Sequence, residues 1–217
     1  MDKKRQARLA IILVAAIIVV DQVVKILVKT HMQIGEDIPL IGNWCRLHFI
    51  ENEGFAFGTQ FGGVVGKYIL TAIRLVASGV IVWYIARLIR NSTRTSLIMA
   101  FSLVLAGAVG NLIDSLFYGI IFDESYYSVA TLFPPEGGYA PLFQGKVVDM
   151  FYFPLFEFDW PTWMPFWGGQ HFEFFNAIFN VADSAVTVGV VWLLVEYFFI
   201  EAKHSKSGET KGEGSKE

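Results

Sequence analysis

The chain has 217 residues, of which 54% are hydrophobic and 17% charged, and its formal net charge at pH 7 is −3. This apolar share and a mean hydropathy of +0.48 indicate that the solvent of the chain is a lipid bilayer. The weak negative charge excludes a basic surface for nucleic acid. Cys45 is the single cysteine, which excludes an intrachain disulfide or a paired redox thiol and is interpreted as a packing residue.

Four apolar segments are long enough to cross a hydrocarbon core of about 30 Å as helices: residues 9–28, 66–89, 96–121 and 174–200. A basic stretch precedes the first segment, as in a signal peptide. This segment is nevertheless too long for one, carries Asp21 and Lys25, and lacks a small-x-small cleavage site. We therefore expect a retained first helix and a membrane all-α fold with four transmembrane helices.

The positive residues predict the orientation of these helices, because cytoplasmic loops are enriched in Lys and Arg. Basic residues precede the first segment, separate the second from the third and follow the fourth: Lys3, Lys4, Arg5 and Arg8; Arg87, Arg90 and Arg94; Lys203, Lys206 and Lys211. Both termini are therefore expected in the cytoplasm, with outer loops at residues 29–65 and 122–173. Residues 1–202 are expected to form one domain, and residues 203–217 a disordered cytoplasmic tail.

The two outer loops have distinct patterns. Residues 38–41 and 44–50 read as two short strands around a Gly42-Asn43 turn, which predicts a small β-cradle on the periplasmic face. The second loop carries an aromatic run with two interpretations, an interfacial aromatic belt or a grip on a lipid-bearing ligand. The run contains Trp160, Trp163, Phe166 and Trp167.

Acidic residues inside predicted membrane spans are costly and therefore carry either a paired or a functional role. Asp21 and Lys25 are spaced i,i+4 on one helix face and are expected to pair. Asp114 ends a segment in which Gly107 and Gly110 allow close helix approach. Arg74 of the second span is the expected partner of Asp114.

Asp183 differs from the other acids, because no basic residue occurs in its predicted helix before Lys203 and Asn180 lies one turn earlier. A second carboxylate that shares one proton could satisfy it, and Asp149 is the candidate. Such a pair can hydrolyse an amide directly through water. The sequence has no HExxH or GxSxG motif, so carboxylates remain the candidates. A proton-coupled transporter or channel, or a structural scaffold, would also account for buried acids.

Five blocks in order resemble the lipoprotein signal peptidase (signal peptidase II) family: Asp21-Gln-Val-Val-Lys25, Asn52-Glu-Gly-Phe-Ala-Phe-Gly58, Gly107-Ala-Val-Gly-Asn-Leu-Ile-Asp114, Val147-Val-Asp149 and Phe179-Asn-Val-Ala-Asp-Ser-Ala185. The resemblance implies an intramembrane aspartyl endopeptidase that cuts prolipoproteins before a diacylglyceryl-modified cysteine. It implies Asp149 and Asp183 as the catalytic pair. It also implies a supporting set of Asn52, Gly54, Phe57, Asn111 and Asn180, beside Asp21, Lys25, Asp114 and Arg74.

The same resemblance implies a bacterial cytoplasmic (inner) membrane protein with its active site at the periplasmic face. We expect it to act as a monomer among membrane lipids, without metal or cofactor. Two features depart from the family pattern. Ser115 stands where the family often has Arg, and Arg74 is the expected substitute for that charge. The loop before Asp149 and the stretch 153–172 are longer than the family leads one to expect.

Overall fold

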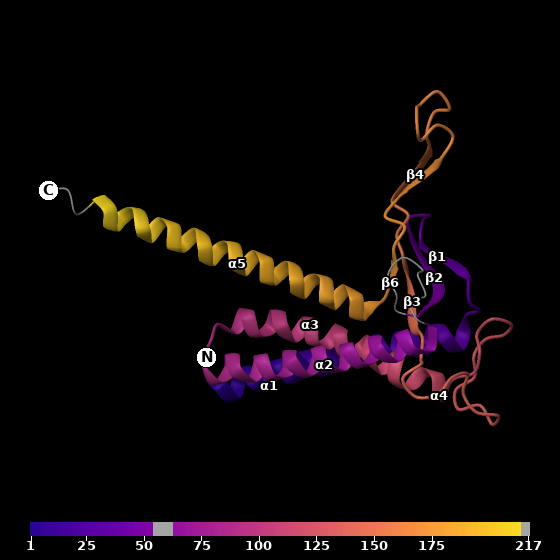
Figure 1. Cartoon of the computed structure of the whole chain (residues 1–217), viewed down its shortest axis with the longest axis horizontal. Helices are drawn as coiled ribbons and strands as arrows, with labels where there is room; N and C mark the ends of the chain where they lie inside the picture. The colour runs from indigo at the N-terminus through magenta and orange to yellow at the C-terminus, as the bar shows by residue number, and fades with distance from the viewer. Residues whose placement is uncertain (54–62, 214–217) are drawn as a thin grey trace. The chain divides into compact units, whose positions relative to one another are not determined.

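The computed structural model describes residues 1–53 and 63–213, with side chains up to residue 198. In this part of the chain, four helical segments are long and apolar enough to cross a membrane (Figure 1). They are α1 (Lys3–His31), α2 (Gly63–Arg90), a continuous third helix, and the first part of α5 (Val181–Glu213). The third helix joins α3 (Thr95–Ile113), the π-helical turn η2 (Asp114–Tyr118) and α4 (Gly119–Ile121). The expected four long apolar helices are confirmed.

The last helix differs from the expectation at both ends. It begins at Val181 rather than at residue 174, because Ile178 and Phe179 pair with a strand instead. It also continues to Glu213 through a segment for which we expected disorder. A helix that has already nucleated propagates at little further cost, and no proline between residues 203 and 213 stops it.

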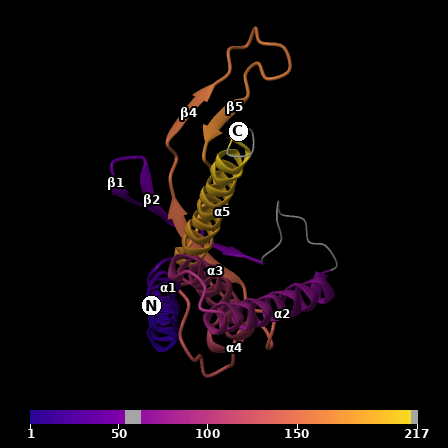
Figure 2. The ribbon, with the colours of Figure 1, turned by 90° about the vertical axis from the view of Figure 1, so that its left-hand side faces the viewer.

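Two antiparallel sheets lie in the segments between the helices. The first has four strands in the order β1 (Asp37–Ile41), β2 (Cys45–Asn52), β3 (Val147–Tyr152) and β6 (Ile178–Phe179). The second is a hairpin of β4 (Phe156–Asp159) and β5 (His171–Phe174), which extends beyond the first sheet (Figure 1, Figure 2). The predicted β1–β2 pair is confirmed, whereas β3 was missed because its apolar run does not alternate.

The described chain divides into two compact units, and the expected single domain stays a prediction. Unit 1 comprises Met1–Ile18, Ala77–Val109 and Ala182–Glu217, and unit 2 comprises Val19–Val76 and Gly110–Val181. The core of unit 1 is aliphatic and is built by Ala10, Ile85, Leu88, Ile98 and Leu105. At Gly107, α3 approaches α5 so closely that a Cβ would lie 2.1 Å from the Ala182 carbonyl oxygen. The small-residue contact expected at Gly107 is therefore present.

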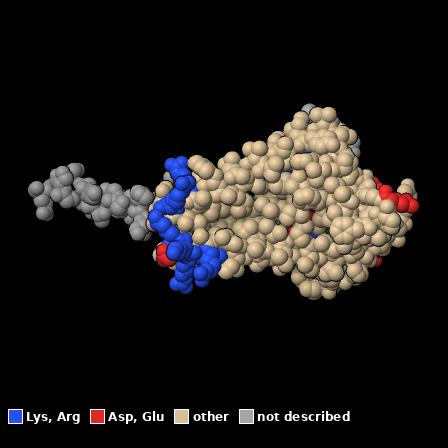
Figure 3. All heavy atoms as spheres, turned by 90° about the horizontal axis from the view of Figure 1, so that it is seen from below, with Lys and Arg blue, Asp and Glu red and all other residues tan. Residues whose placement is uncertain are grey.

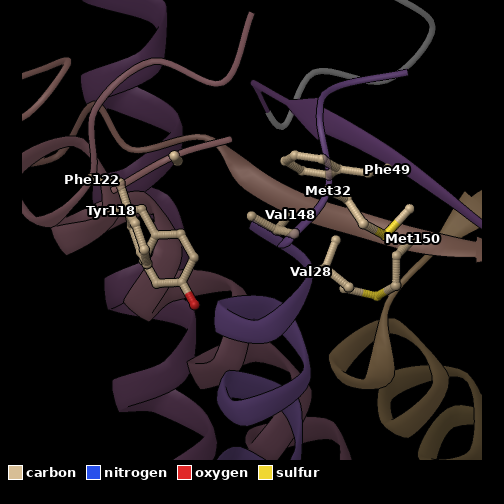
Figure 4. Close-up of a cluster of buried hydrophobic side chains, with 8 residues drawn as sticks. Val28, Met32, Phe49, Tyr118, Phe122, Val148 and Met150 are labelled. Carbon is tan, nitrogen blue, oxygen red and sulfur yellow. The ribbon is translucent and has the colours of Figure 1, made fainter. Parts of the chain in front are cut away.

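The core of unit 2 lies where the end of α1 meets the four-stranded sheet and the end of the third helix (Figure 4). Its buried members come from several elements and the connections between them: Val28, Met32, Phe49, Tyr118, Phe122, Ala130, Val148 and Met150. Because β3 has apolar neighbours on both faces, its side chains from Val147 to Met150 are all buried. This double burial fixes the position of Asp149, the one acid within that run.

Candidate active site

Asp149 lies in the centre of the four-stranded sheet. Its strand, β3, pairs with β2 on one side and with β6 on the other, and Asp149 faces Ile50 in the register. Only 2% of the residue is exposed to solvent. A carboxyl group in such a place must be hydrogen-bonded, because burial removes its water.

Two asparagine amides donate to the two carboxylate oxygens of Asp149. Asn180, which directly precedes α5, donates from Nδ2 to Asp149 Oδ1 at 2.6 Å. Asn52, at the end of β2, donates from Nδ2 to Asp149 Oδ2 at 3.3 Å. These neutral donors orient the carboxylate without adding a charge beside it. Both asparagines were predicted to support this site.

Asn180 also connects Asp149 to the membrane helices of unit 2. Its amide lies 3.0 Å from Asn111 Oδ1 and 3.2 Å from the Val148 carbonyl oxygen. Lys25 Nζ donates to the same Asn111 oxygen at 2.8 Å. Asn111 is therefore held between a cation and an amide.

Lys25 is the centre of a buried ionic cluster that contains two other predicted site residues. Its Nζ lies 2.9 Å from Asp21 Oδ2 and 2.7 Å from Asp114 Oδ2, and all three side chains have no exposed area. The expected Asp21–Lys25 pair is confirmed. Gln22 was not predicted, although it donates to Asp114 Oδ1 at 2.9 Å and accepts from the Tyr118 hydroxyl at 3.1 Å.

The expected pairing of Arg74 with Asp114 is wrong. Asp114 pairs with Lys25 instead, because its Oδ2 atom faces α1. The same oxygen accepts a hydrogen bond from the Val148 amide of β3 at 3.4 Å. Arg74 Nη1 donates to Ser115 Oγ at 2.9 Å. The guanidinium of Arg74, on α2, thus lies at Ser115, the position at which the family often has an arginine.

The π-helical turn η2 explains how the loop before β3 is attached. Widened helical turns free carbonyl groups from the usual i→i+4 pattern. Amides of the loop bind carbonyls of this region: Gly145 to Ser115, Phe143 to Leu116, Ala140 to Gly119 and Tyr139 to Phe122. A Cβ at Gly145 would lie 2.0 Å from the Asp114 carbonyl oxygen, so glycine is required there. The loop leads directly into β3, and its attachment therefore positions Asp149.

A second polar cluster in unit 2 was missed by the sequence analysis. Lys29 binds Glu51 and donates to Ser125 Oγ at 2.7 Å, while Lys146 Nζ lies 3.5 Å from Glu51 Oε2. Burial raises the pKa of the nearby Tyr139 phenol, so the neutral hydroxyl accepts from the Lys146 amide at 2.7 Å. The signal for this cluster was present, because Asp21, Lys25 and Lys29 recur every fourth residue on one face of α1.

Asp183 lies in the first turn of α5 and belongs to unit 1. The expected span of 174–200 placed it well inside a helix, whereas the helix begins only two residues before it. An acid in the first turn interacts favourably with the helix dipole. Asp183 is therefore at the beginning of its membrane span. The predicted supporting residues Gly54 and Phe57 lie outside the described residues.

Within the described part of the chain, no group of three or more His, Cys, Asp or Glu side chains could hold a metal ion. The chemical groups that unit 2 brings together are a buried carboxylate, amide donors and a buried cluster of one lysine and two aspartates. A carboxylate oriented in this way can accept a proton from water.

A family model for signal peptidase (SPase) II matches residues 13–199. The lipoprotein signal peptidase of Porphyromonas gingivalis is 46% identical over 91% of this chain and 86% of its own length. That of Amoebophilus asiaticus is 37% identical over 82% and 73%, respectively.

A bacterial membrane enzyme solved by the in meso method at 2.3 Å resolution has a similar fold, with a TM-score of 0.59. The match covers 89% of this chain and 90% of that one at 24% identity. The family match decides against the transporter and scaffold alternatives, and with four apolar helices it describes a multi-pass membrane protein. The chain belongs to the signal peptidase II family, whose members are aspartic peptidases that remove signal peptides from prolipoproteins.

Proposed function

We propose that this enzyme cuts prolipoproteins immediately before a diacylglyceryl-modified cysteine, with Asp149 and Asp183 as its catalytic pair. It acts as a monomer at the periplasmic face of the bacterial cytoplasmic membrane and needs no metal or cofactor. The lipid chains of the substrate stay in the bilayer, while the four-stranded sheet receives the peptide backbone. The contact between Asn180 and Asp149 is the observation that carries this assignment.

Asn180 supports the pairing of the two acids through the covalent chain. Its amide is 2.6 Å from the Asp149 carboxylate, and Asp183 follows only three residues later. Three residues span at most about 11 Å between Cα atoms, and less when they enter a helix. Asp183 is therefore tethered within reach of a substrate that also contacts Asp149.

The proposed reaction uses one ionised and one protonated carboxyl group. The ionised group takes a proton from a water molecule, whose oxygen attacks the scissile carbonyl carbon. The protonated group donates a hydrogen bond to the carbonyl oxygen and then delivers its proton to the leaving amine of the cysteine. Asn52 and Asn180 hold the Asp149 carboxylate in place during these transfers, and Asn111 holds Asn180.

Chain order and charge support the proposed orientation. α1 begins with exposed basic residues, and Lys3 Nζ donates to the Arg90 carbonyl oxygen at 2.7 Å, which joins that end of α1 to the end of α2. Lys and Arg gather at this end of unit 1 in Figure 3. By the positive-inside rule this end is cytoplasmic. The strands follow the opposite end of α1 along the chain and so belong to the outer side.

The test is cleavage of a purified diacylated prolipoprotein by the detergent-solubilised enzyme, followed by gel shift. Asp149→Asn and Asp183→Asn should each lower the rate by about 10²–10⁴-fold or more, because each removes a proton-transfer group. The control is Asp123→Asn, which loses the same charge but keeps the oxygen that accepts from the Thr131 amide. Normal cleavage by either catalytic variant would refute the pairing. Equal cleavage of the unlipidated precursor would refute the proposed substrate class.

A further inference from the structure

The β4–β5 hairpin has two chemically different faces. The register pairs Phe156 with Phe174 and Phe158 with Phe172, so these four rings share one face with Trp160. The alternate pairs, Glu157 with Glu173 and Asp159 with His171, form the other face. One face of the hairpin is therefore entirely aromatic, and the other carries three acids and a histidine.

The aromatic face is ordered but not covered. Its rings contact one another along the hairpin, with centroid distances of 4.6 Å for Phe156–Phe174 and 5.0 Å for Phe158–Phe172. Phe156 is nevertheless 52% exposed and Phe174 44% exposed. A two-stranded hairpin is marginally stable alone in water, and a large exposed apolar surface marks an interaction site.

The tip of the hairpin continues this surface. Backbone hydrogen bonds close the tip, among them Gly169 to Trp160 and Gln170 to Trp167. Trp163 and Phe166 are exposed on it, and Phe166 has a φ of 72°. A bulky residue in this left-handed region is strained, and strain of this kind accompanies function. The tip thus holds an exposed ring at an energetic cost that burial does not offset.

The occupant is indicated by what the hairpin is joined to. It starts four residues after β3 and ends seven residues before the membrane helix α5. In both views it runs across the direction of the unit 2 portions of α1 and α2, which are membrane spans (Figure 1, Figure 2). An element that crosses the span direction at the end of a span lies along the membrane surface. Aromatic side chains are the residues that favour this interface.

We propose that the β4–β5 hairpin docks on the lipid surface, with its aromatic face and tip in the outer leaflet and its acidic face in water. The docked hairpin anchors the strand that carries Asp149 at a constant depth. The acidic face is kept away from the anionic headgroups, which sets the direction in which the hairpin lies. The inference rests on the proposed function only for the identity of the leaflet.

The test uses consecutive positions of one strand. Cys45 is replaced by alanine, and single cysteines at Glu157, Phe158 and Asp159 carry an environment-sensitive fluorophore. The proteins are reconstituted in phosphatidylethanolamine–phosphatidylglycerol vesicles with nitroxide-labelled lipids. The Phe158→Cys probe should be blue-shifted and quenched several-fold more strongly than the Glu157→Cys and Asp159→Cys probes, whose positions have 67% and 77% exposed side chains.

Equal quenching at all three positions, or none, would overturn the proposal. It would also fail if the Phe158 probe is shielded only when diacylated precursor is added, which would make the face a substrate grip. Shielding that depends on protein concentration would instead indicate a second copy. Cleavage is measured on the same samples. If quenching does not alternate between positions 157, 158 and 159 while cleavage is normal, only the hairpin proposal is rejected. Normal cleavage by Asp183→Asn rejects only the catalytic proposal.

Discussion

Lys25 is the cation on which the buried carboxylates of Asp21 and Asp114 depend. It serves Asp21 and Asp114 at once and also donates to Asn111, which contacts Asn180. A buried ion costs several kcal/mol to desolvate, and this cost is offset only by close partners. One cation between two carboxylates therefore stabilises two elements, α1 and the η2 turn, and through Asn111 it orients Asn180 beside Asp149.

Replacing Lys25 with methionine should destabilise the protein by about 3–5 kcal/mol, because two buried carboxylates lose their cation. Thermal unfolding in detergent measures the change. Asp21→Asn is the matched comparison and should cost less, since Lys25 then still pairs with Asp114. The same or a larger loss in Asp21→Asn would contradict the central position of Lys25.

His171 makes part of the hairpin's stability depend on pH. The hydrogen bond that His171 Nδ1 donates to Asp159 Oδ1, at 2.8 Å, raises the pKa of His171 above its usual 6.5, and Glu157 adds to the effect. Because the pKa of His171 is higher in the folded state, its protonated form stabilises the fold fully below pH 6.5. This stabilisation is lost as the pH rises through the raised pKa. Titration of His171 followed by nuclear magnetic resonance should give a pKa above 6.5. Asp159→Asn should lower it, and an unchanged value would exclude Asp159 as the cause.

At the scale of elements, the contact between α3 and α5 sets the position of the helix that carries Asp183. Gly107 meets the Ala182 carbonyl oxygen and Gly189 meets α3 near Ala100 and Val104. Both contacts have no room for a Cβ. Glycines of this kind let two membrane helices approach through backbone contact.

Gly107→Ala should therefore lower stability by about 1–3 kcal/mol, because the new methyl group forces the helices apart. It should also reduce cleavage by shifting the first turn of α5. Gly79→Ala is the control in the same unit, since a Cβ there meets nothing within 4 Å. That change should be neutral or stabilising by up to about 1 kcal/mol. Unfolding temperature and cleavage rate are measured for both, and equal behaviour would refute the close contact.

For the whole molecule, the decisive property is the side of the membrane on which each connection lies. In a Cys45→Ala background, Tyr127→Cys should react with an impermeant maleimide on intact spheroplasts, because Tyr127 is 97% exposed and lies between α4 and β3, in a connection that we propose to be periplasmic. Asn91→Cys, in the basic connection between α2 and α3, should react only after permeabilisation. The reverse pattern would invert the proposed topology and place the site in the cytoplasm.

Features that depend on neighbouring residues were predictable. The four long apolar helices, the β1–β2 hairpin and the Asp21–Lys25 pair follow from segment length, turn residues and i,i+4 spacing. The alternation in 156–159 and 171–174 was also readable, although the hairpin was not predicted. The start of α5 could not be predicted, because the apolar run from residue 174 is compatible with either a helix or a strand. Pairing of Ile178 and Phe179 with β3 decides between the two.

The sequence by itself determined that this chain crosses a membrane, which residues are charged inside it and which family it resembles, because these are properties of composition and order. Only the tertiary structure decided which groups meet: Lys25 rather than Arg74 at Asp114, and Asn52 and Asn180 at Asp149. The physical reason is that a buried charge selects its partner by geometry across elements far apart in the chain. The spacing of residues along the sequence does not reveal which of these groups lie close together in space.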